Sequence, residues 1–189
     1  MNRIYNCKQI MALAFITVMV LNLFAADLKQ GENKGMEMTM DKFHQEQAVT
    51  LFNQSWELLL KEGRNRQDED ILVNMVHASL YHWRQIGKPI NILRGEWMIC
   101  HVYTLLKHKE EALYHADNVL RLMDEQKPED WDLAYCYEAM ARTQAMLGNK
   151  EQFSKYNALA EEAGKKIVED GDKKQFDGDM KDEYWFGLK

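Results

Sequence analysis

The chain has 189 residues, of which 46% are apolar and 29% charged, values typical of one globular domain and unlike those of a disordered chain or a protein with several membrane spans. Its formal net charge of −6 argues against a nucleic-acid partner, because affinity for phosphate rests mainly on Lys and Arg. Only 2 Pro and 10 Gly accompany 12 Met, so the composition favours long helices over a sheet with many turns.

The first 26 residues show the pattern of a secretory signal peptide. Arg3 and Lys8 precede a run of mostly apolar residues, which ends at Ala25 and Ala26. The run is slightly shorter than the roughly 20 apolar residues that a membrane-spanning helix needs. We therefore expect residues 1–26 to be a signal peptide, cleaved after one of these alanines, and the protein to be periplasmic or secreted.

Two alternatives stay open for this segment. The apolar run could remain uncleaved, in which case it would anchor the protein in a membrane. Translation could instead start at Met36, Met38 or Met40, which would leave a cytoplasmic protein. The polar residues 27–40 are expected to form a flexible linker to the folded domain.

Six amphipathic helices are predicted in that domain, residues 41–168. Apolar residues recur there every three or four positions, and no strand-like alternation of useful length occurs. Gly residues end several helices, and the two Pro residues lie in first turns, where a missing backbone N–H costs little. The predicted helices cover about 41–62, 68–86, 89–107, 109 to the residues before Pro128, 128–147, and a last segment that includes Phe153–Ile167.

Connections of about two to six residues join these helices, so consecutive helices should be antiparallel neighbours. Each apolar stripe is wide enough to touch more than one neighbour. Small residues such as Ala112, Ala116, Ala141 and Ala160 would let the helix axes approach closely. The sequence therefore predicts an all-α fold of three antiparallel helix pairs stacked in layers.

Two stretches resemble the tetratricopeptide repeat, a helix pair that stacks into solenoids. Residues 106–122, LKHKEEALYHADNVLRL, are similar to the turn and second helix of the repeat, with Ala112 at the small position where the helices cross. Within residues 137–160, Ala141 falls at the small position of the first helix and Gly148 falls in the turn. The resemblance implies a short solenoid of helix pairs.

The chain departs from the repeat pattern at two positions. Lys107 stands where the turn glycine is expected and Phe153 where the second crossing alanine is expected, and 41 residues instead of 34 separate the two crossing positions. The segments HASLYHW (77–83) and RGEW (94–97) also resemble a group of uncharacterised bacterial helical-repeat proteins, for which no activity is known. The resemblance covers about residues 41–168 and concerns the fold, because one fold hosts many functions.

The tetratricopeptide resemblance also implies a candidate binding surface. In such an array the first helices of successive pairs line a concave groove that commonly binds peptides. Aligning the two turns places three residues of the third helix and three of the fifth in this groove, each trio on one helical face. These candidate groove residues are Arg94, Trp97, His101, Tyr135, Glu138 and Arg142. Aromatic residues and Arg dominate binding hot spots, so we expect a non-enzymatic protein that binds a protein or peptide partner here.

A second polar set lies on the predicted second helix, where His77, Tyr81 and Arg84 share one face. These residues could form the wall of a pocket, or the His and Tyr rings could simply hydrogen-bond across a helix junction. A structural interpretation is also open for the groove, with its Trp in the core and its charged residues on a solvated edge. The alternative function is a small-molecule binder or an unrecognised enzyme that uses His77, Tyr81, Arg94 and His101.

No cofactor and no metal site are expected. The sequence contains no phosphate-binding glycine loop and no nucleophile elbow. His77 and His82 are five residues apart, so they do not form the i, i+4 pair of a helical zinc site. Cys100 and Cys136 lie in apolar helical patterns and are expected to be buried thiols, with a disulfide as the alternative in an exported protein.

The tail, residues 169–189, ends in four large apolar side chains that seldom lie free in water. They are Tyr184, Trp185, Phe186 and Leu188. We expect them to fold back as a cap on the exposed face of the last helix, as the ends of a solenoid require. The alternative is docking into a partner or into a second copy of the chain, so no oligomeric state is predicted.

Overall fold

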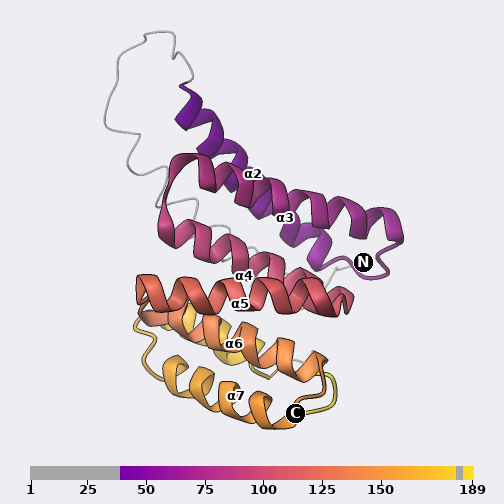
Figure 1. The fold of residues 1–189 in the computed structure, drawn as a ribbon, viewed down its shortest axis with the longest axis vertical. Helices are drawn as coiled ribbons and strands as arrows, with labels where there is room; N and C mark the ends of the chain where they lie inside the picture. Colours follow the sequence, from indigo (N-terminus) through magenta and orange to yellow (C-terminus); the bar gives the residue numbers. More distant parts are fainter. Residues whose placement is uncertain (1–38, 182–184) are drawn as a thin grey trace, which may run out of the picture.

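The computed structural model describes residues 39–181 and 185–189. Within these ranges the chain forms seven helices and no strand, which confirms the predicted all-α class (Figure 1). The helices are α2 (Met40–Leu59), α3 (Arg66–Ile86), α4 (Pro89–Leu106), α5 (Lys109–Gln126), α6 (Asp130–Met146), α7 (Lys150–Gly164) and α8 (Asp170–Asp179). None of the helices in these ranges is both long and apolar enough to cross a membrane. The predicted signal peptide, 1–26, and most of the predicted linker lie outside the described residues.

Several helix ends follow from residues that satisfy or tolerate the terminal backbone geometry. At the start of α3, the Asn65 side chain accepts a hydrogen bond from the Asp68 N–H while the Asp68 carboxylate accepts one from the Asn65 N–H. Gly87 ends α3 with a φ of 65°, and Pro89 opens α4. Lys107 ends α4 with a φ of 61°, so this lysine adopts the left-handed conformation for which the repeat pattern expects glycine.

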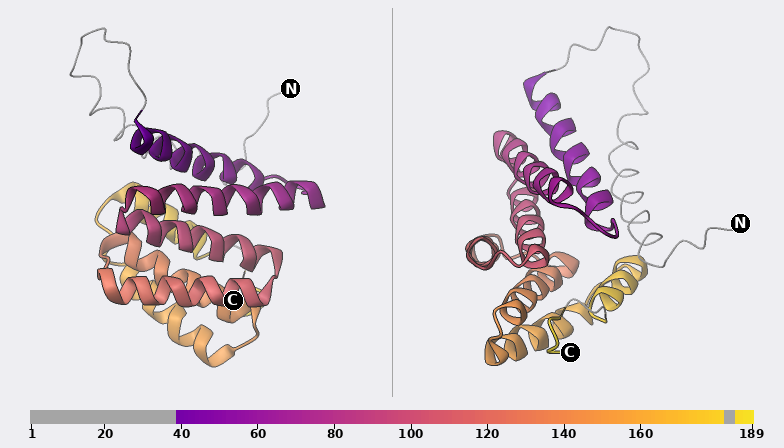
Figure 2. Two further views of the ribbon diagram at one scale, coloured as in Figure 1. Left: turned by 45° about the horizontal axis from the view of Figure 1, so that its top comes forward. Right: turned by 90° about the vertical axis from the view of Figure 1, so that its right-hand side faces the viewer.

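Consecutive helices pack against each other along the chain. α2 packs on α3, α4 on α5 and α6 on α7, while α3 contacts α4 and α6 contacts both α4 and α5. In the right-hand view of Figure 2 the helices follow a curved row from α2 at the top to α7 at the bottom, with α5 on the outer side of the curve. α8 lies on the inner side, where it contacts α6 and α7.

Small side chains lie where the helices approach each other. Ala112, Ala116, Ala141 and Ala160 are completely buried. Larger apolar residues fill the spaces around them, and a buried leucine such as Leu93 stabilises the fold by about 1.5–3 kcal/mol through the surface that it removes from water. The core is therefore continuous between helices that are distant in sequence.

The helix α8 differs from the prediction, which treated residues 169–189 as a tail without a helix. Its sequence, DGDKKQFDGD, contains two glycines and one large apolar residue, so the pattern gives little helical signal. Phe176 is buried, and its ring makes an edge-to-face contact with Tyr135 of α6. Gly164 at the end of α7 leaves the space that this ring occupies. Tertiary packing of one side chain therefore stabilises α8.

Candidate functional site

A row of aromatic side chains crosses the helices α2, α4 and α6. The aromatic row consists of Trp56 from α2, Trp97 and His101 from α4, and Tyr135 from α6. The Trp97 ring stacks on His101 at 5.5 Å between centroids and meets the Tyr135 ring edge-to-face, also at 5.5 Å. Trp56 lies 6.1 Å from Trp97 and 6.4 Å from His101. The structure thus brings three of the predicted groove residues together on one face.

One polar atom of the aromatic row has an unmet hydrogen-bonding need. The indole Nε1 of Trp97 is buried and has no hydrogen-bond partner within the part of the chain that the structure describes. The Trp97 side chain itself is half-buried, as is that of His101. A buried N–H without an acceptor is unfavourable, so this atom is suited to donate a hydrogen bond to an incoming acceptor.

Arg94, another predicted groove residue, is held by α6. Its guanidinium donates two parallel hydrogen bonds of 2.9 Å to the carboxylate of Asp132. Its Cζ also lies 4.4 Å from the centroid of the Trp131 ring, in a cation–π contact. Arg94 therefore links α4 to α6, and the contacts with Asp132 and Trp131 partly cover its side chain. Arg94 lies on the same helix as Trp97 and His101 of the aromatic row.

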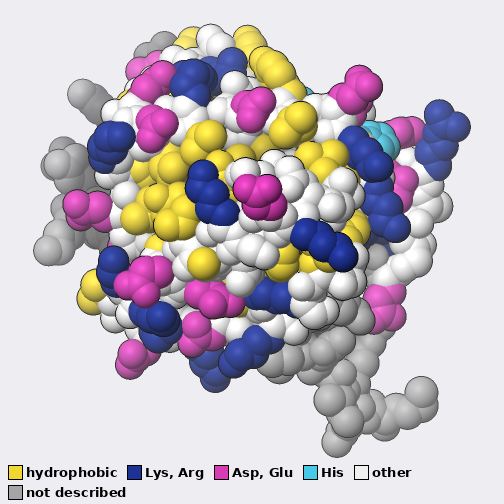
Figure 3. Space-filling model, turned by 60° about the horizontal axis from the view of Figure 1, so that its bottom comes forward, with side chains coloured by type: hydrophobic (Ala, Val, Ile, Leu, Met, Phe, Trp, Pro, Cys, Tyr) yellow, Lys and Arg dark blue, Asp and Glu magenta, His cyan; other side chains and the backbone are white. Residues whose placement is uncertain are grey.

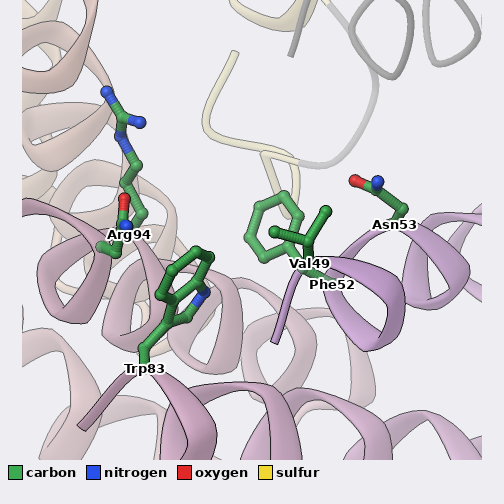
Figure 4. A pocket seen from close by; sticks show the side chains of 6 residues that line it. Val49, Phe52, Asn53, Trp83 and Arg94 are labelled. Atoms are coloured by element: carbon green, nitrogen blue, oxygen red, sulfur yellow. The ribbon is translucent and has the colours of Figure 1, made fainter. Parts of the chain in front are cut away.

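A pocket lies next to the aromatic row, between α2, α3 and α4. Its lining residues are Val49, Phe52, Asn53, Trp83, Asn91 and Arg94. Figure 4 shows the side chains of Val49, Phe52 and Trp83 turned toward one another, with Arg94 on the neighbouring helix. The space is about 10 Å³, close to that of one water molecule. Pockets for small-molecule ligands are far larger, so this space is not a ligand pocket of that kind.

The three predicted groove residues of α6 are covered by the C-terminal residues of the chain. Tyr135, Glu138 and Arg142 are each at most 7% exposed, so they are not a solvated edge. Tyr135 donates a hydrogen bond of 2.6 Å to the carboxylate of Asp179. Arg142 pairs with Glu138, donates a 2.7 Å hydrogen bond to the backbone carbonyl of Asp179, and lies under the ring of Trp185.

Burial and the neighbouring carboxylate fix the protonation state of Tyr135. Removal from water raises the pKa of its phenol well above the usual value near 10, and the negative charge of Asp179 raises the pKa further. The phenol is therefore a hydrogen-bond donor throughout the neutral pH range. This donor holds the end of α8 against α6.

The second predicted polar set divides into two places. The His77 Nε2 lies 2.9 Å from the hydroxyl of Tyr103, and the His77 ring contacts His115. Arg84 pairs with Glu96 on α4. Tyr81 is 56% exposed and lies beside other rings at the start of α2, so it does not join the other two.

Glu96 organises the contacts of α3, α4 and α5, and it was not among the predicted site residues. Its carboxylate is completely buried and accepts hydrogen bonds from Arg84 at 2.5 Å, from His115 at 2.7 Å and from Asn118 at 3.2 Å. Burial alone would raise the pKa of Glu96, but the hydrogen bonds and charges of His115 and Arg84 outweigh it and hold the pKa below its usual value. The network is satisfied within the protein, which favours a structural role.

The residues of the alternative small-molecule or enzymatic site are not assembled. His77 contacts Tyr103 and His115, whereas Arg94 pairs with Asp132 and His101 stacks in the aromatic row. Within the described ranges no group of three or more His, Cys, Asp or Glu side chains is arranged to hold a metal ion. Tyr81 lies apart from the other three residues, beside the rings of His44 and His82, so the four residues occupy four separate environments.

Both cysteines of the described chain are buried and free. Burial raises the pKa of the Cys100 thiol to about 12, and it raises the pKa of the Cys136 thiol as well. A thiol that stays protonated is a poor nucleophile, so both act as small apolar residues.

The surface around α7 carries charges of both signs. Figure 3 shows Lys and Arg side chains interspersed with Asp and Glu around an area of hydrophobic side chains. This view of the molecule therefore shows no extended surface of only positive or only negative side chains. Mixed charges around an apolar area are suited to protein contacts.

No family model, no curated protein and no solved structure matches this chain. The candidate site therefore rests on its own geometry.

Sequence reasoning missed some residues that shape the site. Trp56 was not among the predicted site residues, and only its ring contacts with Trp97 and His101 show that it belongs to the aromatic row. Glu96 carried a signal, since it is the single acidic residue of the mostly apolar segment Pro89–Leu106. Asp179 carried none, because it lies in the part of the tail where no helix was predicted.

Proposed function

We propose that this chain is a non-enzymatic helical protein that binds a peptide segment of a partner protein along the inner face of α2, α4 and α6. The aromatic row is the observation that carries the proposal, because it joins the half-buried rings of Trp56, Trp97 and His101 on α2 and α4 to the buried ring of Tyr135 on α6. Aromatic residues dominate the energy of protein interfaces, since they bury a large area at little cost in side-chain entropy. The unpartnered Trp97 indole supplies a donor for a backbone carbonyl of the peptide.

We propose the tetratricopeptide-like solenoid as the architecture behind this face. The pairing of α2 with α3, α4 with α5 and α6 with α7, together with contacts between successive pairs, supports it. In such a stack the first helix of each pair contributes to one concave side.

Export of the protein, with residues 1–26 as its signal peptide, is part of the proposal. A native chain that starts at Ala26 or Asp27 would support export, and one that starts at Met36 would contradict it.

Selection from a peptide library tests the binding proposal. Purified full-length protein should enrich peptides with a shared sequence pattern, and Trp97→Leu should lose that pattern while keeping its melting temperature within a few degrees, because the leucine still fills part of the site. The matched control is Tyr114→Leu, which changes an exposed aromatic residue on α5. We expect this control to keep the pattern.

Two results would contradict the proposal. One is a library that yields no shared pattern with the wild-type protein. The other is a pattern that Trp97→Leu retains and Tyr114→Leu loses, since that would move the binding surface to α5.

A further inference from the structure

The C-terminal residues 185–189 pack on the protein through Trp185, which is fully buried, and through Phe186 and Leu188, which are partly buried against the same apolar cluster. Trp185 is 1% exposed, and its ring lies between two cations, with the Arg142 Cζ 4.3 Å from the ring centroid on α6 and the Lys189 Nζ also at 4.3 Å. Phe153 of α7 contacts the same ring at 5.9 Å. The indole is therefore a buried anchor between α6 and α7.

Polar contacts of this segment lie at its edge or within the segment itself. The Lys189 ammonium hydrogen-bonds to the Met180 carbonyl at 2.9 Å and lies 3.8 Å from the carboxylate of Glu161. The Leu188 N–H bonds to the Trp185 carbonyl at 3.0 Å and closes a tight turn. One buried aromatic anchor with ionic contacts around it is the arrangement by which short peptides are recognised at interfaces.

The turn that presents the indole is itself strained. Phe186 has a φ of 53°, in the left-handed region that residues with a side chain seldom adopt, and Gly187 follows with a φ of 78°. The strain at Phe186 weakens the binding of the chain's own segment. A partner peptide that avoids this strain can therefore compete with it.

We propose that the surface around Arg142 on α6 and α7 is a recognition site for a short tryptophan-containing peptide of a partner protein, and that residues 185–189 occupy this site until the partner replaces them. The partner segment carries a tryptophan for the Arg142 guanidinium, with a basic residue close behind it in the position of Lys189. This inference rests on the proposed use of the inner face for peptide binding, and it specifies the chemistry of the peptide at α6.

Cleavage after folding tests the proposal on the complete chain. A recognition sequence for a specific protease is inserted between Lys181 and Asp182, the protein is folded and then cut, and a fluorescent peptide of residues 182–189, DEYWFGLK, is added. We expect the labelled peptide to bind and to be displaced by unlabelled peptide. The same peptide should bind the uncut protein far more weakly, because the attached segment then competes at high local concentration.

Matched variants identify the anchor. A peptide with Trp185→Ala should bind about tenfold more weakly or worse, as expected for an aromatic hot spot, and this variant cannot affect folding of the protein. In the protein, Arg142→Gln should weaken binding of the DEYWFGLK peptide, whereas Arg121→Gln, on an exposed face of α5, should leave it unchanged.

Each alternative role of the segment gives a contrary result. A cut segment that never exchanges, even against a large excess of peptide, would make it a fixed structural cap. A cut segment that dissociates and does not bind again would show that the surface around Arg142 does not recognise this peptide. A dimer of the uncut protein that Trp185→Ala abolishes would assign the surface to a second copy of the chain. All three results would leave the Trp97 library selection unaffected, so failure here is distinguishable from failure of the proposed function.

Discussion

Glu96 is a carboxylate without contact to water, and the helices on either side of α4 supply its partners. Arg84 comes from α3, while His115 and Asn118 come from α5. A buried charge is tolerated only when hydrogen bonds replace its hydration, and here three donors do so. Glu96 therefore ties together two helix pairs that otherwise meet through apolar contacts.

Replacing Glu96 tests this role. Glu96→Gln should lower the free energy of unfolding by about 1–3 kcal/mol at neutral pH, because the charged hydrogen bonds are lost in a buried place. Urea unfolding measures the change. The control is Glu125→Gln, which removes an exposed ion pair with Arg121 and should cost less than about 1 kcal/mol.

The pH dependence of the stability difference between wild type and Glu96→Gln gives a second measurement of the Glu96 interaction. Since the pKa of Glu96 is lower in the folded than in the unfolded protein, its stabilisation is present above the ordinary value of 4.5 and is lost as the pH falls through the folded pKa. The stability difference between wild type and Glu96→Gln should therefore shrink below pH 4.5. A difference that stays constant with pH would show that the charge of Glu96 does not stabilise the fold.

At the level of single elements, α8 depends on the absence of a side chain at Gly164. A Cβ at this position would overlap the ring of Phe176, which is buried. The nearby Gly171 lies within α8 itself, and a Cβ there would meet nothing within 4 Å. The two glycines therefore allow a matched pair of substitutions.

Gly164→Ala should destabilise the protein and Gly171→Ala should stabilise it. Overpacking against Phe176 costs about 1–3 kcal/mol, whereas alanine at an open helical position gains about 0.5–1 kcal/mol over glycine. Thermal unfolding measures both. Equal effects of the two substitutions would mean that Phe176 does not hold α8 on α7, and partial rescue of Gly164→Ala by Phe176→Leu would show that it does.

Across the whole molecule, burial is concentrated in the central helices. Twelve of the 17 residues of α6 are buried, compared with four of the 20 residues of α2. α6 contacts α4, α5, α7 and α8, whereas α2 packs mainly on α3. Opening of α2 therefore breaks fewer contacts than opening of α6.

Hydrogen exchange followed by mass spectrometry should show this gradient. After correction for intrinsic rates, amides in the middle of α2 should exchange at least about tenfold faster than those in the middle of α6, because local opening costs less free energy than global unfolding. Protection of α4 provides the internal reference. Equal protection of α2 and α6 would show that all the helix pairs unfold as one unit.

The sequence by itself determined the fold class and most helix boundaries, because these follow from local chemistry. Apolar spacing specifies a helix and its buried face, and residues such as Gly87 and Pro89 stop or start it through their own backbone preferences. The resemblance to the tetratricopeptide repeat, and not the spacing, implied that Trp97 and Tyr135 lie on one surface, and the two rings are in edge-to-face contact in the structure.

Only the tertiary structure decided which charged and terminal residues meet. The partners of Glu96 come from helices before and after its own, and the contact of Trp185 with Arg142 joins residues 43 positions apart. Helical periodicity gives the direction in which a side chain points from the axis of its helix, but it does not say which residue of another helix the side chain contacts. The helix α8 shows the same limit, because a segment with weak helical propensity folds when one ring, Phe176, finds a space left by Gly164.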